Sequence, residues 1–256
     1  LDSNRDVSPF VTDKQGKPLT KNPLKDARVR KAISLALNRD AIVSRVMEGE
    51  AVAAGQPLPD GYPGTSKNLK PDKFDTAQAK KLLAEAGYPD GFGITIHAPN
   101  NRYVNDEQIA QAVAQMLSRA GIATKVDAMP SSVYFTRATK LEFSLMLLGW
   151  SAGSGEMSDS LRPLLGTFDA KKGWGNANRG RYSNSKFDAM LEDALVTIND
   201  AKREALLARA TEIAMADQGI IPLHFQMNVW AMKKNLSYSP RTDEYTFAWM
   251  FKPVGK

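Results

Sequence analysis

The stretch that decides the fold covers residues 92–149 and begins with FGITIHA at residues 92–98, a weakly alternating run that predicts a strand. The segment NDEQIAQAVAQMLSRA at residues 105–120 predicts an amphipathic helix, because its apolar residues recur every three or four positions. The pattern continues with an expected strand, helix and buried strand at residues 122–128, 131–141 and 143–149. Alternating strands and helices are typical of a layered α/β fold, in which right-handed crossovers place helices over the sheet.

Upstream of this stretch, the sequence predicts three helices and one long loop. Asp26, Asn38 and Asp75 can each accept hydrogen bonds from the first free amides of a helix, so each marks an expected helix start. Residues 51–73 contain too many glycines and prolines for regular structure and are expected to form a loop. Residues 1–22 are polar and do not resemble the opening of a core.

Downstream, the prediction is a long surface segment followed by helices and short strands. Residues 151–184 are rich in glycine, and long loops of this kind are usually functional or mobile. We expect helices at 185–196 and 201–217, a strand pair at 220–226 and 229–232, and a strand or short helix at 245–251.

The composition is that of an ordinary globular protein and excludes several kinds of site. Of the 256 residues 43% are hydrophobic and 24% charged, and none is cysteine, which excludes disulfides, thiolate zinc sites and a cysteine nucleophile. The two histidines, His97 and His224, lie far apart without ligand spacing, so we expect no metal site. The net charge of +6 is spread among acidic residues, so we expect a generally basic protein and no nucleic-acid partner.

Motifs for membrane insertion and for catalysis are missing from the sequence. No apolar run approaches the length of a membrane span. No phosphate-binding loop, dinucleotide turn or nucleophile elbow occurs, although Gly153-Ser154-Gly155 is superficially similar to the last. Its only candidate base is the remote His224. We therefore expect no catalytic residue and no cofactor.

Four segments, taken in order, carry a family resemblance. They are NPLKDARVRKAI at residues 22–33 with Asn38 and Arg39, FDTAQAKKLLAEAGY at 74–88, FSLMLLGW at 143–150, and RYSN at 181–184 with IPL at 221–223. Together they resemble the extracellular solute-binding proteins of the oligopeptide, dipeptide and nickel class (ABC importer family 5), over about residues 20–240.

The resemblance implies an α/β fold that is the C-terminal lobe of a two-lobed periplasmic binding protein, with a mixed sheet flanked by helices. In that family a solute is enclosed between hinged lobes and then passes to a membrane permease with an ATPase. We therefore expect a non-enzymatic substrate-binding component of an ABC importer that captures peptides or peptide-like small solutes. The expected partners are the ABC permease and ATPase subunits. We expect a monomer in the periplasm or a cell-surface lipoprotein, with the signal segment outside this chain.

The resemblance also implies a division of the chain. Family members are usually about twice this length, so an N-terminal part is expected to be missing. Residues 1–22 are then the segment crossing from the missing lobe, residues 23–220 are the C-terminal α/β lobe, and residues 221–256 form strands returning toward the first lobe.

The loop after the strand that ends at Gly149 is expected to face the cleft. Trp150 could lie along a ligand or anchor the core at the strand end, and Ser151 could donate a hydrogen bond to a ligand. Peptide-binding relatives usually carry an aspartate three residues after this tryptophan, which pairs with the ligand's amino terminus. Here that position is Gly153, with Glu156 as a substitute in a different place. A buried ammonium without a partner is costly, so a ligand without one is favoured.

Five further residues are candidate ligand contacts, each with a structural alternative. Arg137 could hold a carboxylate or lie on the surface of its helix. Asn101 follows a strand and could reach the cleft. Arg181 and Tyr182 are in the glycine-rich segment, where Arg181 could simply tie down the loop. His224 is in a stretch where relatives present a cleft aromatic, and a buried, hydrogen-bonded histidine is the stronger interpretation.

Two other functions are compatible with the sequence. The first is a ligand sensor or chaperone module that keeps this fold without a permease. The second, less favoured, is a hydrolase with an unrecognised site, whose activity would depend on His224 or Ser154.

Overall fold

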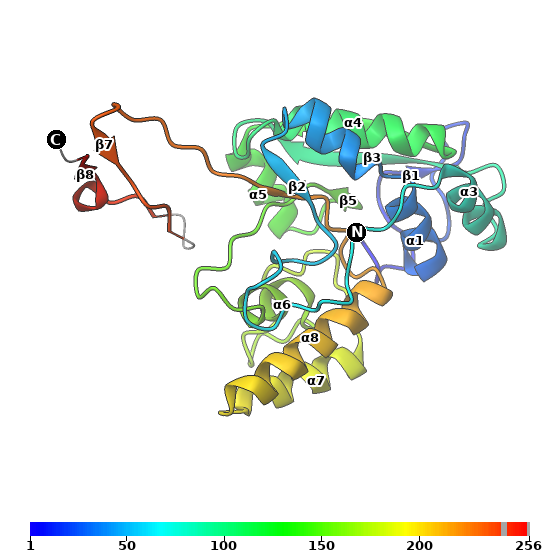
Figure 1. Cartoon of the computed structure of the whole chain (residues 1–256). Helices are drawn as coiled ribbons and strands as arrows, with labels where there is room; N and C mark the ends of the chain where they lie inside the picture. Colours follow the sequence, from blue (N-terminus) through cyan, green and yellow to red (C-terminus); the bar gives the residue numbers. More distant parts are fainter. Residues whose placement is uncertain (242–244, 255–256) are drawn as a thin grey trace.

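The computed structural model describes residues 1–241 and 245–254, and its centre is a mixed sheet built around β3 (Phe92–Pro99) (Figure 1). β4 (Ile122–Met129) pairs with β3 in parallel along its whole length. The other edge of β3 is shared by β1 (Val11–Thr12), which is antiparallel, and β5 (Leu145–Met146), which is parallel. The strand–helix–strand pattern of residues 92–149 therefore forms the expected α/β sheet, although β5 is shorter than its apolar run.

Helices predicted from their caps surround this sheet. Asp26 accepts a hydrogen bond from the Arg28 amide at the start of α1 (Ala27–Leu35), which follows the short 3-10 helix η1 (Pro23–Lys25). Asn38 and Asp75 cap the next two helical segments in the same way. These segments are α2 (Arg39–Ala41), which continues into the π-helical η2 (Ile42–Val46), and α3 (Thr76–Glu85). The crossover helices of the sheet are α4 (Asp106–Arg119) and α5 (Ser131–Thr139).

A second apolar core lies among three later helices. They are α6 (Ser158–Leu165), α7 (Ser185–Val196) and α8 (Asp200–Ala216), of which α7 and α8 run side by side in Figure 1. The prediction that residues 151–184 form one long loop is therefore wrong at α6. Its leucines at positions 161, 164 and 165 face this core, and the surrounding glycines masked the short helical pattern.

A small two-stranded sheet joins the early and late parts of the chain. β2 (Ala51–Ala53) pairs antiparallel with β6 (His224–Gln226), so residues 51–73 are not entirely a loop. The predicted strand pair of 220–226 with 229–232 is also wrong, because residues 229–232 form no strand and β6 takes its partner from far upstream. A hairpin prediction looks only at neighbours in sequence and could not find this pairing.

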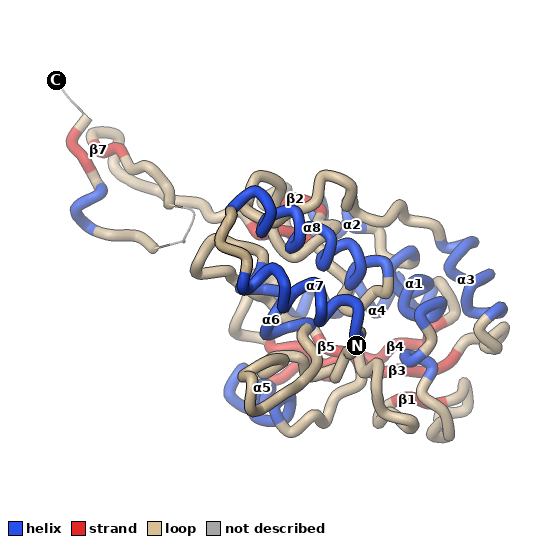
Figure 2. Tube along the Cα trace, turned by 90° about the horizontal axis from the view of Figure 1, so that it is seen from below, coloured by secondary structure: helices blue, strands red, loops and turns tan. Residues whose placement is uncertain are grey.

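The chain ends in an arm, residues 227–254 as far as they are described, that stands away from both cores (Figures 1 and 2). It contains β7 (Leu236–Ser237) paired with β8 (Lys252–Pro253), and the 3-10 helix η3 (Ala248–Met250). Of the two structures predicted for residues 245–251, a strand or a short helix, η3 is the short helix. At the other terminus, Val11 of β1 is 2% exposed in the sheet core, so the polar opening segment does contribute to a core.

Candidate functional site

A cleft with a volume of about 660 Å³ lies where the sheet core and the helical core meet. Its wall includes Ile96 of β3, Leu145 of β5 and Leu164 of α6. The loops that follow β3 and β5 also reach it, because these strands are parallel neighbours whose carboxyl ends meet. Ligands of open α/β sheets bind beyond the carboxyl ends of the strands, so this cleft is the candidate functional site.

Tyr103 forms part of the wall because Gly149 leaves room for its ring. A side-chain carbon at Gly149 would lie 2.6 Å from a ring carbon of Tyr103, far inside normal contact distance. The Tyr103 hydroxyl donates a hydrogen bond to the Gly149 carbonyl oxygen at 3.3 Å. The sequence analysis missed Tyr103, although an aromatic residue four positions after a strand end was an available signal.

The structure places Trp150 and Ser151 in the cleft wall. Trp150 is 41% exposed, and its indole N–H donates a hydrogen bond to the Asp159 carbonyl oxygen at 3.1 Å. The ring is thus fixed at the surface of the cleft rather than buried as a core anchor. Direct contact of these two residues with a ligand stays a prediction.

Gly153 lies outside the wall, and the two acids near it already have partners. A side-chain carbon at Gly153 would come within 4.0 Å of a carboxylate oxygen of Asp159, which accepts a hydrogen bond from the Ser154 amide at 3.0 Å. Glu156 binds the Arg203 guanidinium at 2.5 and 2.6 Å, and these hydrogen bonds lower the pKa of the Glu156 carboxyl. Glu156 is therefore paired with an arginine of α8, and a ligand ammonium would have to displace Arg203 to bind it.

Arg137 and Asn101 have structural partners and do not line the cleft. The Arg137 guanidinium binds Glu142 at 2.9 Å and Asp127 at 3.4 Å, and the bond to Glu142 raises the pKa of Arg137. The side-chain oxygen of Asn101 accepts a hydrogen bond from the Ser131 amide at 2.8 Å, at the start of α5.

Arg181 and Tyr182 also lie outside the cleft wall. The Arg181 guanidinium stacks 3.9 Å from the centre of the Phe168 ring, as expected for a residue that ties down its loop. Tyr182 is 3% exposed in the helical core, and burial raises the pKa of its hydroxyl.

His224 lies in the cleft wall on β6. Its Nδ1 atom is buried without a hydrogen-bond partner among the described residues, and burial lowers the pKa of the imidazole. The expectation of a hydrogen-bonded histidine is therefore not met at this nitrogen, which leaves His224 a candidate ligand contact.

Two arginines that the sequence analysis did not single out complete the site. Arg102 follows β3 and Arg179 is in the loop before α7, and both line the cleft. Neither forms an ion pair with any residue in the described part of the chain. They come from segments nearly eighty positions apart, so no local motif could have joined them.

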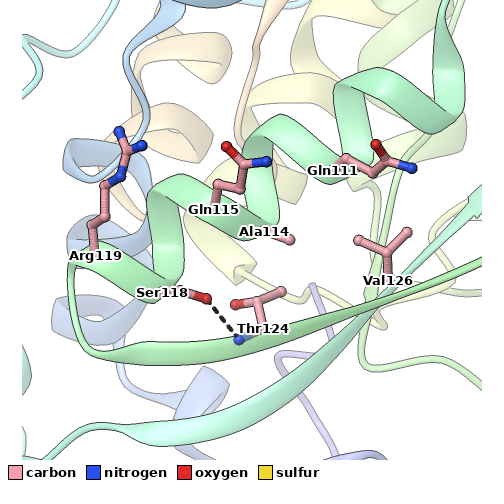
Figure 3. Close-up of a pocket in the computed structure, with 7 residues that line it drawn as sticks. All are labelled: Gln111, Ala114, Gln115, Ser118, Arg119, Thr124 and Val126. Atoms are coloured by element: carbon pink, nitrogen blue, oxygen red, sulfur yellow. Dashed lines mark hydrogen bonds between the residues drawn. The ribbon is translucent and has the colours of Figure 1, made fainter.

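A second hollow, of about 520 Å³, lies between α4 and the exposed edge of β4 (Figure 3). Gln111, Gln115, Ser118 and Arg119 of α4 and Thr124 and Val126 of β4 line it, and Ser118 points toward Thr124. The Ser118 hydroxyl accepts a hydrogen bond from the Thr124 amide at 3.2 Å, so part of the strand edge is satisfied by the helix. Its residues are distinct from those of the cleft.

His97 is a buried titratable group beside the site. It is fully buried in β3 and stacks 4.1 Å from the Phe143 ring, and neither ring nitrogen has a hydrogen-bond partner within residues 1–241 and 245–254. Burial lowers the pKa of His97 below 6.5, outweighing the opposite effect of the Asp127 carboxylate 3.5 Å away. Arg137 lowers the pKa further, and Glu142 raises it.

Acidification is expected to destabilise the fold through His97. Below about pH 6.5 His97 is protonated in the unfolded chain but stays neutral in the folded protein, where its pKa is lower. Proton binding therefore favours unfolding as the pH falls. Denaturant unfolding at pH 7 and pH 5 should show a smaller loss of stability in a His97→Phe variant than in the parent protein. Equal losses in the two proteins would contradict this role for His97.

Metal and membrane features are absent from the part of the chain that is described. Within it, no three histidine, aspartate or glutamate side chains gather in a way that could hold a metal ion. Within the same residues, no helix is both long and apolar enough to span a membrane.

Comparison with known proteins identifies the family. The pattern of the "Bacterial extracellular solute-binding proteins, family 5 Middle" matches residues 6–172, more than half of the chain. The chain belongs to this family. The prediction from the four sequence segments is thereby confirmed, as is the α/β fold of a periplasmic-binding-protein lobe.

Several family 5 members are similar to this chain. "Heme-binding protein A" of Haemophilus influenzae is 31% identical over 209 residues, 79% of this chain and 37% of that protein. "Glutathione-binding protein GsiB" of Shigella dysenteriae is 31% identical over 229 residues, 86% of this chain and 43% of that protein. The chain thus spans less than half the length of these relatives.

A solved family structure has the same fold. The periplasmic binding protein DppA of Helicobacter pylori, associated with an ABC transporter and solved in complex with the peptide STSA, superposes with a TM-score of 0.74. It is 27% identical, and the match covers 85% of this chain and 41% of that protein.

Proposed function

We propose that this chain is part of the substrate-binding component of an ABC importer and that it captures peptide-like solutes in the cleft. One observation carries the proposal: the ends of β3 and β5 open into a cleft that combines the aromatic Tyr103 and Trp150 with Arg102 and Arg179, two cations that form no ion pair with any residue the structure describes. Apolar walls with a few polar anchors suit small-molecule binding. The relatives named for glutathione and heme, and the neighbour that holds a peptide, support a solute of this size.

We infer that capture works by closure of two lobes. A ligand that contacts both lobes shifts the open–closed equilibrium by its differential affinity, without making or breaking a bond. In this proposal residues 23–220 are one lobe, residues 1–22 cross from the other lobe, and residues 221–256 return to it. The exposed apolar side chains of the arm, such as Trp249 at 69% and Val229 at 69%, support a contact with further protein.

The proposal extends to partners and location. A soluble receptor must hand its solute to membrane subunits, so we propose an ABC permease and ATPase as partners and a monomeric receptor. The extracellular role of the family supports the periplasm, or a lipoprotein anchored at the cell surface, as the place of action.

Native mass spectrometry of the protein as its gene encodes it, purified without denaturation, tests the proposed capture. We expect a retained adduct whose fragments include amino acids. A protein that retains nothing and is not stabilised thermally by a pooled tripeptide library would contradict solute capture. Release of cleaved products instead of the intact solute would favour the hydrolase alternative.

Uptake by cells separates an importer from a sensor. Deletion of the gene is expected to abolish uptake of the isotope-labelled adduct. Unchanged uptake together with a lost transcriptional response would favour the sensor.

A further inference from the structure

We propose that the free edge of β4, residues 124–128, is a docking site for a partner protein, which adds an extended, acidic segment to the sheet as a further strand. This edge borders the hollow between α4 and β4 (Figure 3), whose residues are distinct from those of the cleft. The proposal is therefore independent of the proposed solute capture.

β4 is the last strand on its side of the sheet. It pairs with β3 along one edge, and no other described strand pairs with it. The Met129 carbonyl oxygen accepts a hydrogen bond from the Asn100 amide at 3.0 Å, on the β3 side, whereas the Thr124 amide donates to Ser118 on the other side. Because the backbone groups of successive residues alternate in direction, odd-numbered residues of β4 bond to β3 and even-numbered residues point outward.

The outward-pointing groups are satisfied only at the start of the strand. There the Thr124 hydroxyl donates a hydrogen bond to the Ile122 carbonyl oxygen at 2.8 Å, and the Ser118 hydroxyl accepts one from the Thr124 amide. Farther along, the amides and carbonyls of Val126 and Ala128 have no outward partner among the residues that the structure describes. An unpaired edge of this kind is a template for a strand from another chain.

The hollow offers room for the side chains of an added strand. It has a volume of about 520 Å³ and is lined by Thr124 and Val126 from β4 and by Gln111 and Gln115 from α4. Side chains alternate between the two faces of a strand, so every second side chain of an added segment would enter the hollow. The others would lie on the opposite face, beside Lys125.

Two cations flank the edge, one on each face of the sheet. Arg119 lines the hollow, and Lys125 is exposed on the face away from it. Neither side chain forms an ion pair or a hydrogen bond in the part of the chain that is described. Asp127, the one acid of β4, is already bound by Arg137 at 3.4 Å. Opposite charges in cross-strand pairs stabilise a sheet, so this edge favours an acidic segment.

A synthetic peptide tests strand addition to the protein as its gene encodes it. The probe is the fluorescein-labelled peptide amide TTTVEET, which in antiparallel pairing places its valine opposite Val126 and its first glutamate opposite Lys125. Fluorescence anisotropy should show saturable binding with a Kd below about 1 mM. The peptide TTTVQQT should bind about fivefold more weakly. Absence of saturable binding, or equal affinity of the two peptides, would overturn the proposal.

Backbone methylation of the probe distinguishes strand addition from charge attraction. In the proposed pairing the valine amide of the peptide points at the β4 edge, and the amide of the next residue points away from it. N-methylation of the valine should weaken binding at least about tenfold, and N-methylation of the first glutamate should change it less than threefold. Equal effects of the two methyl groups, or the reverse order, would overturn strand addition.

Variants of the protein locate the site. A double variant with Lys125→Gln and Arg119→Gln should lose the preference for TTTVEET over TTTVQQT. Val126→Pro removes an outward N–H without affecting the bonds to β3, and it should weaken binding at least about tenfold. Lys186→Gln, which removes the same charge from an exposed position on α7, is the control and should bind like the parent protein.

Circular dichroism confirms that each variant is folded. A preference for the acidic peptide that survives in the folded double variant would overturn the role of the two cations. Unchanged binding by folded Val126→Pro protein would overturn docking at this edge.

Discussion

Arg30→Ala is expected to lower the free energy of unfolding by about 3 kcal/mol, because the buried Arg30 side chain connects α1 to the C-terminal end of α8. Arg30 is 4% exposed on α1. It donates hydrogen bonds to the carbonyl oxygens of Leu24 and Lys25 at 3.0 and 2.9 Å. It also donates to the carbonyl and carboxylate oxygens of Asp217 at 2.6 and 2.8 Å, at the end of α8. Removal leaves these acceptors without a partner and opens a cavity.

Chemical denaturation of the variant measures this loss, and Arg28→Ala is the matched control. Arg28 is on the same helix and also binds an aspartate, Asp26, but its side chain is 51% exposed. Surface ion pairs of this kind contribute little, so the control should unfold close to the parent protein. Similar denaturation midpoints for Arg30→Ala and the parent protein would show that the hydrogen bonds of Arg30 do not stabilise the fold.

Arg30 and Arg39 together explain how the early helices support the cleft. Arg39 is also 4% exposed, and its guanidinium donates to the Pro222 carbonyl oxygen at 2.8 Å and to Ser34. The two side chains thereby fix residues 217 and 222, on either side of the turn that leads from α8 to β6. His224 follows directly in the cleft wall, so the position of that wall depends on arginines that never touch it.

The segment that most clearly resembles the family is therefore structural. Within residues 22–33, Asn22 accepts a hydrogen bond from the Leu24 amide and Asp26 caps α1, while Arg30 ties α1 to α8. Caps and helical periodicity are local signals, and the sequence predicts them well. The helices of this segment could be predicted for this reason, whereas the family was predicted from the resemblance of its residues to those of known members.

The cleft depends on contacts between distant segments and could be predicted only in part. Trp150 follows a strand end, and this local signal placed it in the wall. Arg179 reaches the wall only because the loop before α7 packs against α5, which no pattern within residues 151–184 reveals. Arg137 was a candidate for holding a ligand carboxylate, but its guanidinium binds Glu142 and Asp127. Side-chain partners of this kind are decided by tertiary packing.

Gly91→Ala is expected to destabilise the fold by about 3 kcal/mol or more, because two separate costs fall on one position. Gly91 has a φ of +74°, which L-residues with a side chain adopt only with strain. An added side-chain carbon would also lie 1.9 Å from the Gly121 carbonyl oxygen, an overlap with backbone that no rotamer change relieves. Gly91 and Gly121 immediately precede β3 and β4, so the overlap pushes apart the first residue pair of the parallel sheet, Phe92 with Ile122.

Gly87→Ala separates the two costs. Gly87 has a φ of +90° and no atom within 4 Å of an added side-chain carbon, so its substitution should cost only about 1–2 kcal/mol of conformational strain. Denaturant midpoints of the two variants measure the difference. Equal midpoints would contradict an additional cost from the overlap with the Gly121 carbonyl oxygen. Because β3 leads into the loop with Arg102 and Tyr103 in the cleft wall, a partly folded Gly91→Ala protein should also lose solute binding, whereas Gly87→Ala should keep it.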